Sequence, residues 1–167
     1  FIFFAIKGEK NNGEKFIEES VKNGAVAIVC SRSCNYKNSK IPIIKTSDTR
    51  QLLSEICAKF YKLKPSNIIA VTGTNGKTSV ADLFFQILNL NKMPVASIGT
   101  LGVKYKNKKI KLNLTSPDTI SLHKILTEIK KNKIDNVILE ASSHGLHQKR
   151  IHHLKLKAGI FTNFSRD

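Results

Sequence analysis

One segment constrains the fold of this chain more than any other, and it reads Val71-Thr72-Gly73-Thr74-Asn75-Gly76-Lys77-Thr78-Ser79. The residues just before it, Ile68 to Val71, form a short apolar run that is typical of a buried strand. Apolar residues then recur at helical spacing after it. The sequence therefore predicts a strand, a glycine-bounded turn and an amphipathic helix in immediate succession. The apolar positions of that helix are Val80, Leu83, Phe84, Ile87 and Leu88.

A turn of this kind is suited to hold phosphate groups. Gly73 and Gly76 let backbone N–H groups converge on an anion, and the N-terminus of the next helix adds partial positive charge. Lys77 can reach the β- and γ-phosphates, and the Thr78 hydroxyl can ligate Mg²⁺. Packing alone gives no reason for Gly-Lys-Thr at a strand-to-helix junction, so we interpret the turn as an ATP-binding loop. Its predicted ATP-binding residues are Gly73, Thr74, Asn75, Gly76, Lys77, Thr78 and Ser79.

The loop also carries a family resemblance. Val71 stands where the general pattern G-x-x-x-x-G-K-[ST] has its first glycine. The shortened form, Thr-Gly-Thr-Asn-Gly-Lys-Thr, resembles the loop of the Mur ligases and of the related folylpolyglutamate and cyanophycin synthetases. The resemblance implies an ATP-dependent amide-bond ligase that passes through an acyl phosphate. Such a reaction needs positioning and cationic stabilisation more than a protein nucleophile, so Lys77 is the predicted catalytic residue.

Two further segments resemble the branch of the Mur ligases that adds the third residue of the peptidoglycan stem peptide. They are Leu114 to Asp118 and Glu140 to Arg150, and the second is the more specific. The resemblance implies UDP-N-acetylmuramoyl-dipeptide as a substrate, with meso-diaminopimelate or L-lysine as the amino acid added. Thr78 and Glu140 are the predicted Mg²⁺ ligands, because a hydroxyl and a strand-end carboxylate supply hard oxygens. The predicted substrate-binding residues are Thr115, Ser116, Ser142, Gln148 and Arg150, of which Arg150 offers two parallel donors.

Several of these residues also have simpler explanations. Glu140 can be a surface acid at a strand end, and Thr115 and Ser116 can form a turn and a helix cap before Pro117. Ser142 can cap a short helix. The functional alternatives that stay open are another Mur ligase or a folylpolyglutamate-type synthetase, and a nucleotide- or nucleic-acid-binding module without ligase activity.

The formal net charge of +16 raises the question of a nucleic-acid partner. The lysines are scattered along the chain, however, and the arginines, which phosphate and base recognition favour, are only Arg32, Arg50, Arg150 and Arg166. We therefore expect no nucleic-acid partner. No apolar run approaches the about 20 residues that span a bilayer, and the N-terminus of this sequence lacks the charged region, apolar region and small-residue cleavage site of a signal peptide. A cytoplasmic monomer without a membrane partner is the expectation.

Alternating strand and helix patterns predict an α/β fold. We expect a partial N-terminal α/β uridine-binding domain over residues 1–46. A P-loop central ATP-binding domain follows over residues 47–167, with a mostly parallel sheet and helices on both faces. Predicted strands lie at 2–5, 25–29, 41–44, 68–71, 95–98, 103–105, 110–114, 137–139 and 158–161. A helix is also predicted at 120–130. Ligands should gather where Gly73, Thr115 and Glu140 emerge together from the carboxyl ends of the strands.

The ends of the sequence suggest a piece of a longer ligase. The chain starts without a methionine, inside an apolar strand pattern, and the resemblance stops within the central domain. We hypothesise that the 167 residues cannot complete the ligation alone.

Overall fold

The computed structural model describes residues 1–8, 11–38, 40–106, 108–112 and 115–165. The chain divides into two compact units, Phe1–Leu53 and Ser54–Asp167. This division falls within helix α2 (Thr49–Phe60). A domain boundary between residues 46 and 47 stays a prediction.

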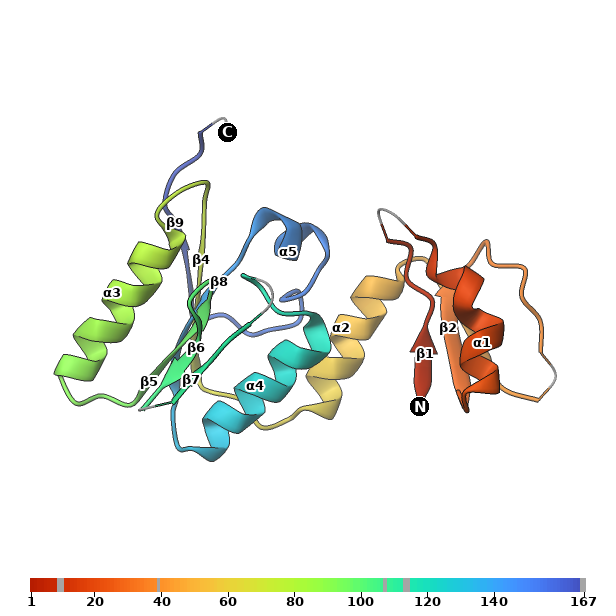
Figure 1. Ribbon diagram of the computed structural model, residues 1–167, viewed down its shortest axis with the longest axis horizontal. Helices are drawn as coiled ribbons and strands as arrows, with labels where there is room; N and C mark the ends of the chain where they lie inside the picture. Colours follow the sequence, from red (N-terminus) through yellow and green to blue (C-terminus); the bar gives the residue numbers. More distant parts are fainter. Residues whose placement is uncertain (9–10, 39, 107, 113–114, 166–167) are drawn as a thin grey trace. The chain divides into compact units, whose positions relative to one another are not determined.

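The first unit contains a parallel sheet with the strand order β1-β2-β3, in which β1 and β2 are labelled in Figure 1. Its core includes Ile17, Ile28 and Cys30, which are all buried. The three strands start within two residues of their predicted positions, so the predicted strand-helix-strand pattern is confirmed here. The elements of this unit are β1 (Ile2–Phe4), η1 (Gly13–Phe16), α1 (Ile17–Lys22), β2 (Ala27–Ser31) and β3 (Ile43–Thr46).

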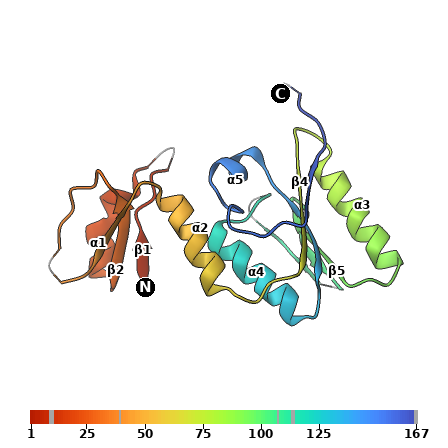
Figure 2. The same ribbon diagram turned by 180° about the vertical axis from the view of Figure 1, so that it is seen from behind.

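The second unit is built on a six-stranded sheet with the order β7-β6-β5-β8-β4-β9. Strands β5, β8, β4 and β9 are parallel, whereas β6 and β7 add an antiparallel edge. Helices α3 and α4 lie on opposite sides of this sheet (Figures 1 and 2). The predicted fold class is confirmed. The elements are β4 (Asn67–Thr72), α3 (Lys77–Leu90), β5 (Val95–Gly99), β6 (Gly102–Tyr105), β7 (Lys108–Ile110), α4 (Thr119–Lys131), β8 (Asn136–Glu140), α5 (Ser143–His147) and β9 (Ala158–Phe161).

Strand β4 is buried on both faces. Ile68 and Ala70 belong to the core cluster that contains Leu122 of α4, whereas Val71 packs with Ala81 of α3. Successive side chains of a strand point to opposite faces, so each helix receives alternate residues of β4. Burial on both faces explains why this strand is a continuous apolar run in the sequence.

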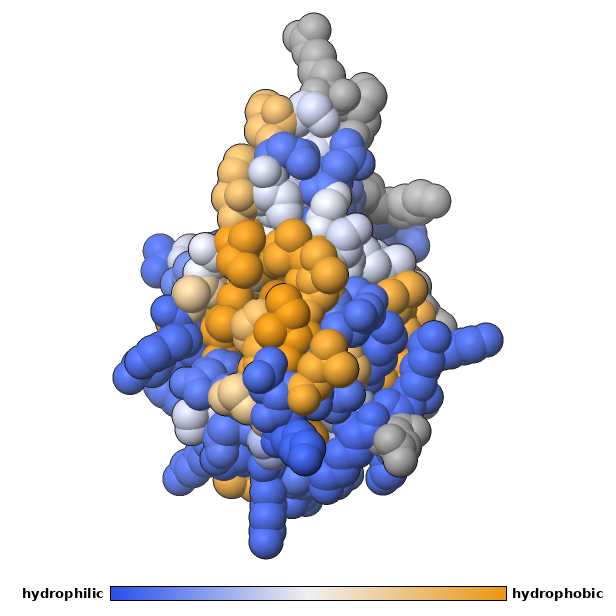
Figure 3. All heavy atoms as spheres, turned by 90° about the vertical axis from the view of Figure 1, so that its left-hand side faces the viewer, coloured by the Kyte–Doolittle hydropathy of each residue, from blue (hydrophilic) through white to orange (hydrophobic). Residues whose placement is uncertain are grey.

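Helix α3 is less covered than its apolar sequence suggests. Leu83, Ile87 and Leu90 are 56%, 55% and 80% exposed. Figure 3 shows a cluster of hydrophobic residues on the side of the molecule where α3 lies in Figure 1. Helical spacing thus predicted that Leu83 and Ile87 share one face, but not how much of that face other residues cover.

The strands predicted at 103–105 and 110–114 correspond to the antiparallel pair β6 and β7, but the second strand was placed too late. Tyr105 pairs with Lys108 and Val103 with Ile110, so β7 begins two residues before the predicted 110–114. All three residues of β7 are exposed, and an exposed edge strand carries no apolar alternation to mark it. The predicted strand end Leu114 lies outside the described residues.

No helix in the described part of the chain combines the length and the apolar character needed to cross a lipid bilayer.

The three cysteines are buried free thiols. Burial raises the pKa of Cys30 to about 11, and a hydrogen bond with Cys34 adds to this rise. Burial also raises the pKa of Cys57. Because the thiolate is the reactive form, these raised pKa values favour a packing role over a nucleophilic one.

His123 is the least expected residue in the core of the second unit. It lies on α4 and is fully buried, and neither ring nitrogen has a hydrogen-bond partner among the described residues. Its ring stacks on Tyr61 at a centroid distance of 6.1 Å. Burial lowers the pKa of His123 from 6.5 to about 4, and nearby Lys64 and His153 act in the same direction. The unfolded chain therefore takes up this proton first as the pH falls.

We expect His123 to make the second unit acid-sensitive. Its contribution to the free energy of unfolding is complete above about pH 6.5 and falls progressively, by about 2–3 kcal/mol, as the pH approaches 4. His123→Leu should remove this part of the pH dependence, which urea unfolding at several pH values would measure. The control is His147→Leu, because His147 is exposed. Equal pH slopes for His123→Leu and the unchanged protein would contradict the assignment.

Candidate functional site

The predicted ATP-binding loop joins β4 to α3, and the segment that follows β9 closes it. The Thr74 amide donates to the Asn163 carbonyl at 3.0 Å, and the Asn75 amide donates to Asn163 Oδ1 at 3.0 Å. Thr162 Oγ1 donates to the Asn75 carbonyl at 2.6 Å. Gly73 has a φ of +136°, and a Cβ on it would lie 2.1 Å from Thr162 Oγ1. Only glycine fits at this position.

The amides that the loop leaves for a ligand are those at the start of α3. Gly76 is the N-cap residue with a left-handed backbone, and it provides no side-chain cap. The first N–H groups of an α-helix have no acceptor within the helix, and here they belong to residues 76–79. These amides and the partial positive charge of the helix N-terminus favour an anion. The amides of Thr74 and Asn75, by contrast, are already bonded to Asn163.

Lys77 lies folded back over the loop. Its Nζ donates to the Gly73 carbonyl at 2.5 Å and to the Thr74 carbonyl at 2.8 Å. Both acceptors are neutral carbonyl oxygens. They orient the ammonium group but, unlike a carboxylate, bring no negative charge next to it. The ammonium group is therefore held at the loop, at the start of α3.

Glu140 is held in a buried position at the end of β8. It is 2% exposed, and its carboxylate accepts hydrogen bonds from Thr78 Oγ1 at 2.9 Å and from Thr100 Oγ1 at 3.0 Å. The Thr100 amide donates to the other carboxylate oxygen at 3.0 Å. The alternative explanation, a surface acid, is therefore wrong.

Thr78 and Glu140 fit a magnesium ion. Their oxygens lie 2.9 Å apart, and adjacent ligands of an octahedral Mg²⁺ at 2.0–2.1 Å are about 2.9 Å apart. No cluster of three or more His, Cys, Asp and Glu residues that would bind a metal occurs in the described residues. The pair suits Mg²⁺, which takes few protein ligands and completes its shell with phosphate and water.

A cavity of about 360 Å³ brings these groups together with part of the predicted substrate site. It joins the loop and the start of α3 to the ends of β5 and β8, as expected for ligand sites at the carboxyl ends of parallel strands. Of the predicted substrate-binding residues, Thr115 and Ser142 reach it. Its lining residues are Thr74, Asn75, Gly76, Lys77, Thr78, Ser79, Thr100, Thr115, Glu140 and Ser142.

Ser116 and Ser142 form a bridge beneath this cavity. The Ser116 hydroxyl, on a residue that is 3% exposed, donates to the Glu140 carbonyl at 2.9 Å and accepts from the Ser142 amide at 3.0 Å. Ser142 also caps α5, because its hydroxyl accepts from the Gly145 amide at 3.1 Å. The simpler explanation for Ser142 as a helix cap is thus correct, and a contact with substrate would be an additional role.

Arg150 and Gln148 are paired. The Arg150 Nε and Nη2 atoms donate to Gln148 Oε1 at 3.1 and 2.7 Å, and Nη1 donates to the Ser116 carbonyl. The guanidinium is therefore oriented by two neighbours and ties the α5 region to the segment before α4. Its role in substrate binding stays a proposal.

Sequence reasoning missed two residues of the site, Thr100 and Asn163. Thr100 directly follows β5, and Asn163 follows β9 after one residue. Both strands are parallel members of the sheet that also contains β8. The rule that pointed to Glu140, a polar residue at a parallel strand end, applies equally to both.

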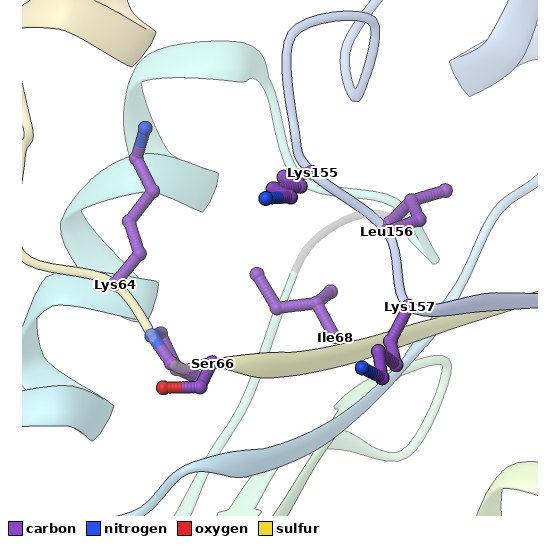
Figure 4. Close-up of a pocket in the computed structure, with 7 residues that line it drawn as sticks. Lys64, Ser66, Ile68, Lys155, Leu156 and Lys157 are labelled. Carbon is purple, nitrogen blue, oxygen red and sulfur yellow. The ribbon is translucent and has the colours of Figure 1, made fainter.

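A second cavity, of about 400 Å³, lies at the opposite end of β4 and is unrelated to the loop (Figure 4). Its lysine side chains surround Ile68, and Lys64 Nζ donates to the Ala58 carbonyl at 2.8 Å. Burial lowers the pKa of Lys64. The lining residues are Lys64, Pro65, Ser66, Ile68, Lys155, Leu156 and Lys157.

Comparison with known proteins agrees with this geometry. A model described as the Mur ligase middle domain matches residues 71–167, and one described as the Mur ligase family catalytic domain matches residues 1–61. Two similar proteins, from Brucella melitensis and Zymomonas mobilis, are 40% and 42% identical over 167 residues. Both are named UDP-N-acetylmuramoyl-L-alanyl-D-glutamate–2,6-diaminopimelate ligase. The chain spans 34% of the length of each, and each match covers 100% of this chain.

Solved structures show the same relationship. A structure with the same ligase name superimposes on 99% of this chain and 34% of its own, with a TM-score of 0.82 and 30% identity. A MurF ligase from Thermotoga maritima, solved in complex with ADP, covers 97% of this chain and 34% of its own with a TM-score of 0.57, and at 20% identity it supports the fold alone. The loop, the sheet that presents it and these matches agree: the chain belongs to the Mur ligase family.

Proposed function

We propose that this chain is the part of an ATP-dependent ligase that binds the nucleotide and orients the UDP-linked substrate. The reaction is the addition of 2,6-diaminopimelate to UDP-N-acetylmuramoyl-L-alanyl-D-glutamate in peptidoglycan precursor synthesis, with L-lysine as the alternative amino acid. The observation that carries the proposal is the contact between Thr78 and Glu140 beside Lys77, at the positive end of α3. The similar ligases take their name from the diaminopimelate reaction.

Each residue has a task in this reaction. The amides that begin α3 bind the phosphate chain, and Lys77 neutralises charge on the oxygens of the transferred phosphate. Thr78 and Glu140 hold Mg²⁺, which supplies further positive charge when bound. Thr115, Ser116, Ser142, Gln148 and Arg150 orient the UDP-linked substrate so that its carboxylate attacks the γ-phosphate. The amine of the amino acid then displaces phosphate from the acyl phosphate.

A second possibility is nucleotide binding without ligation, and the length of the relatives favours it. Because it spans 34% of their length, the chain alone can bind nucleotide without completing the ligation. We place both activities in the cytoplasm, in a monomer that needs neither nucleic acid nor membrane.

Calorimetric titration tests the proposal. The 167-residue chain should bind a non-hydrolysable ATP analogue, and Mg²⁺ should tighten that binding. A crystal soaked with the analogue should show its phosphates at the start of α3. Salt-sensitive binding of DNA without any binding of the analogue would instead support the nucleic-acid alternative.

Arg150→Ala should chiefly weaken binding of the UDP-linked substrate. Loss of hydrogen bonds to a charged group costs about 1.5–3 kcal/mol, so we expect the dissociation constant to rise about 10- to 100-fold. Arg150→Lys should recover only part of this loss, because a lysine keeps the charge but not the two parallel donors. The control is Lys131→Ala, which removes one positive charge from an exposed residue of α4. An unchanged affinity for the substrate in the Arg150→Ala titration would remove Arg150 from the site.

A further inference from the structure

The Glu140 carboxylate depends on the end of strand β5 for its position. Both of its oxygens accept hydrogen bonds from Thr100, one from the amide at 3.0 Å and one from the hydroxyl at 3.0 Å. Thr78, on the neighbouring helix, contributes the remaining contact at 2.9 Å, to the same oxygen as the Thr100 hydroxyl. Two of these three hydrogen bonds therefore come from Thr100.

Gly99 provides the space in which the carboxylate lies. A Cβ on Gly99 would be 2.1 Å from Glu140 Oε1 and 2.5 Å from its Cδ. Gly99 is the last residue of β5, and β5 lies next to β8, the strand that ends with Glu140. The close approach of the two strand ends thus requires a residue without a side chain at this position.

The Thr100 hydroxyl also lies 3.2 Å from Thr115 Oγ1. A hydroxyl carries one hydrogen, and a carboxylate accepts more strongly than a neutral hydroxyl, so this hydrogen goes to Glu140. Thr100 therefore lies between Glu140, which is proposed to hold Mg²⁺, and Thr115, which is proposed to contact the UDP-linked substrate. It lines the same cavity as both.

We propose that Thr100, with the space left by Gly99, is the positioning residue that orients Glu140 toward Mg²⁺ on the bound nucleotide. This inference rests on the proposed function. Thr100 acts through Glu140, because it fixes both carboxylate oxygens and leaves Oε2 beside the Thr78 hydroxyl. Without the hydroxyl of Thr100, the carboxylate keeps one hydrogen bond to each oxygen, and its rotation about the last side-chain bond is less restricted.

The test is the Mg²⁺ dependence of nucleotide binding by the 167-residue chain, followed with a fluorescent ATP analogue. Thr100→Val keeps the shape and removes the hydroxyl, and it should raise the Mg²⁺ concentration for half-maximal tightening about 10- to 100-fold, the usual effect of losing a partner of a metal ligand. Binding in the presence of EDTA should stay unchanged. Thr100→Ser restores the hydroxyl and should recover the original Mg²⁺ dependence.

The matched control is Thr127→Val, which removes a hydroxyl of α4 that donates to the carbonyls of Leu63 and His123. If Thr100→Val does not fold, Thr100→Ala carries the same expectation. An Mg²⁺ dependence in the Thr100 variants equal to that of Thr127→Val would overturn the positioning role and leave the proposed function intact. Absence of nucleotide binding by the unchanged chain would overturn both.

Discussion

Replacing Lys77 with alanine is expected to weaken ATP binding about 10- to 100-fold and to abolish acyl-phosphate formation in a full-length ligase that carries this segment. The affinity loss follows from the about 1.5–3 kcal/mol that a charge-assisted hydrogen bond contributes. The loss of chemistry is larger, because a cation on the transferred phosphate acts mainly in the transition state. Titration with an ATP analogue and a single-turnover assay for ADP would measure the two effects.

The position of Lys77 indicates that its replacement should reduce ATP binding without destabilising the fold. Lys77 contacts two loop carbonyls and lies at the start of a helix, outside both faces of the packed sheet. We therefore expect the thermal unfolding of Lys77→Ala to stay close to that of the unchanged protein. Lys124→Ala is the control for net charge, because Lys124 is exposed on α4 and the change removes the same single positive charge. Unchanged turnover in Lys77→Ala would contradict the assignment of the loop.

The sequence predicts strands β4, β5 and β8 of the second unit well because they are largely buried. Strands of this kind are short apolar runs, and the helices between them show regular apolar spacing. Ile68 and Val71 of β4 pack toward different helices, and both were expected in one buried strand. At Lys108 to Ile110 in β7, where all three residues are exposed, no apolar pattern marks the strand, and it was placed too late.

The site could be predicted in part for a similar reason. The loop and Glu140 have local signals, a motif and a charged residue directly after a buried strand. The Thr100–Glu140 contact joins residues 40 positions apart, and the closure of the loop by Asn163 joins residues 88 apart. Such contacts depend on which strands are neighbours in the sheet, and the order β5-β8-β4-β9 does not follow the order of the chain. Neither contact has a signal in the spacing of residues alone.

The closure of the loop by the segment after β9 leads to the second large effect, that of Gly73→Ala. An alanine there would adopt a φ of +136° with difficulty, and its Cβ would lie 2.1 Å from Thr162 Oγ1 and 2.8 Å from the Asn163 carbonyl. Backbone strain of this kind costs about 1–3 kcal/mol, and the displaced segment adds to it. We expect the free energy of unfolding to fall by about 2–4 kcal/mol and the affinity for an ATP analogue to fall at least about 10-fold.

Alanine substitutions at two other glycines distinguish backbone strain from the clash with Thr162 and Asn163 as causes of this loss. Gly24 has a φ of +87°, and a Cβ on it would have no atom within 4 Å, so Gly24→Ala tests backbone strain without a clash. Gly159, in β9, likewise has no neighbour within 4 Å and no strained φ, so Gly159→Ala should be close to neutral. If Gly73→Ala costs no more than Gly24→Ala in urea unfolding and binds the analogue normally, Thr162 and Asn163 do not hold the loop. If only Gly73→Ala loses both stability and nucleotide, the shape of the phosphate site depends on a segment 88 residues away, as the Asn75–Asn163 hydrogen bond indicates.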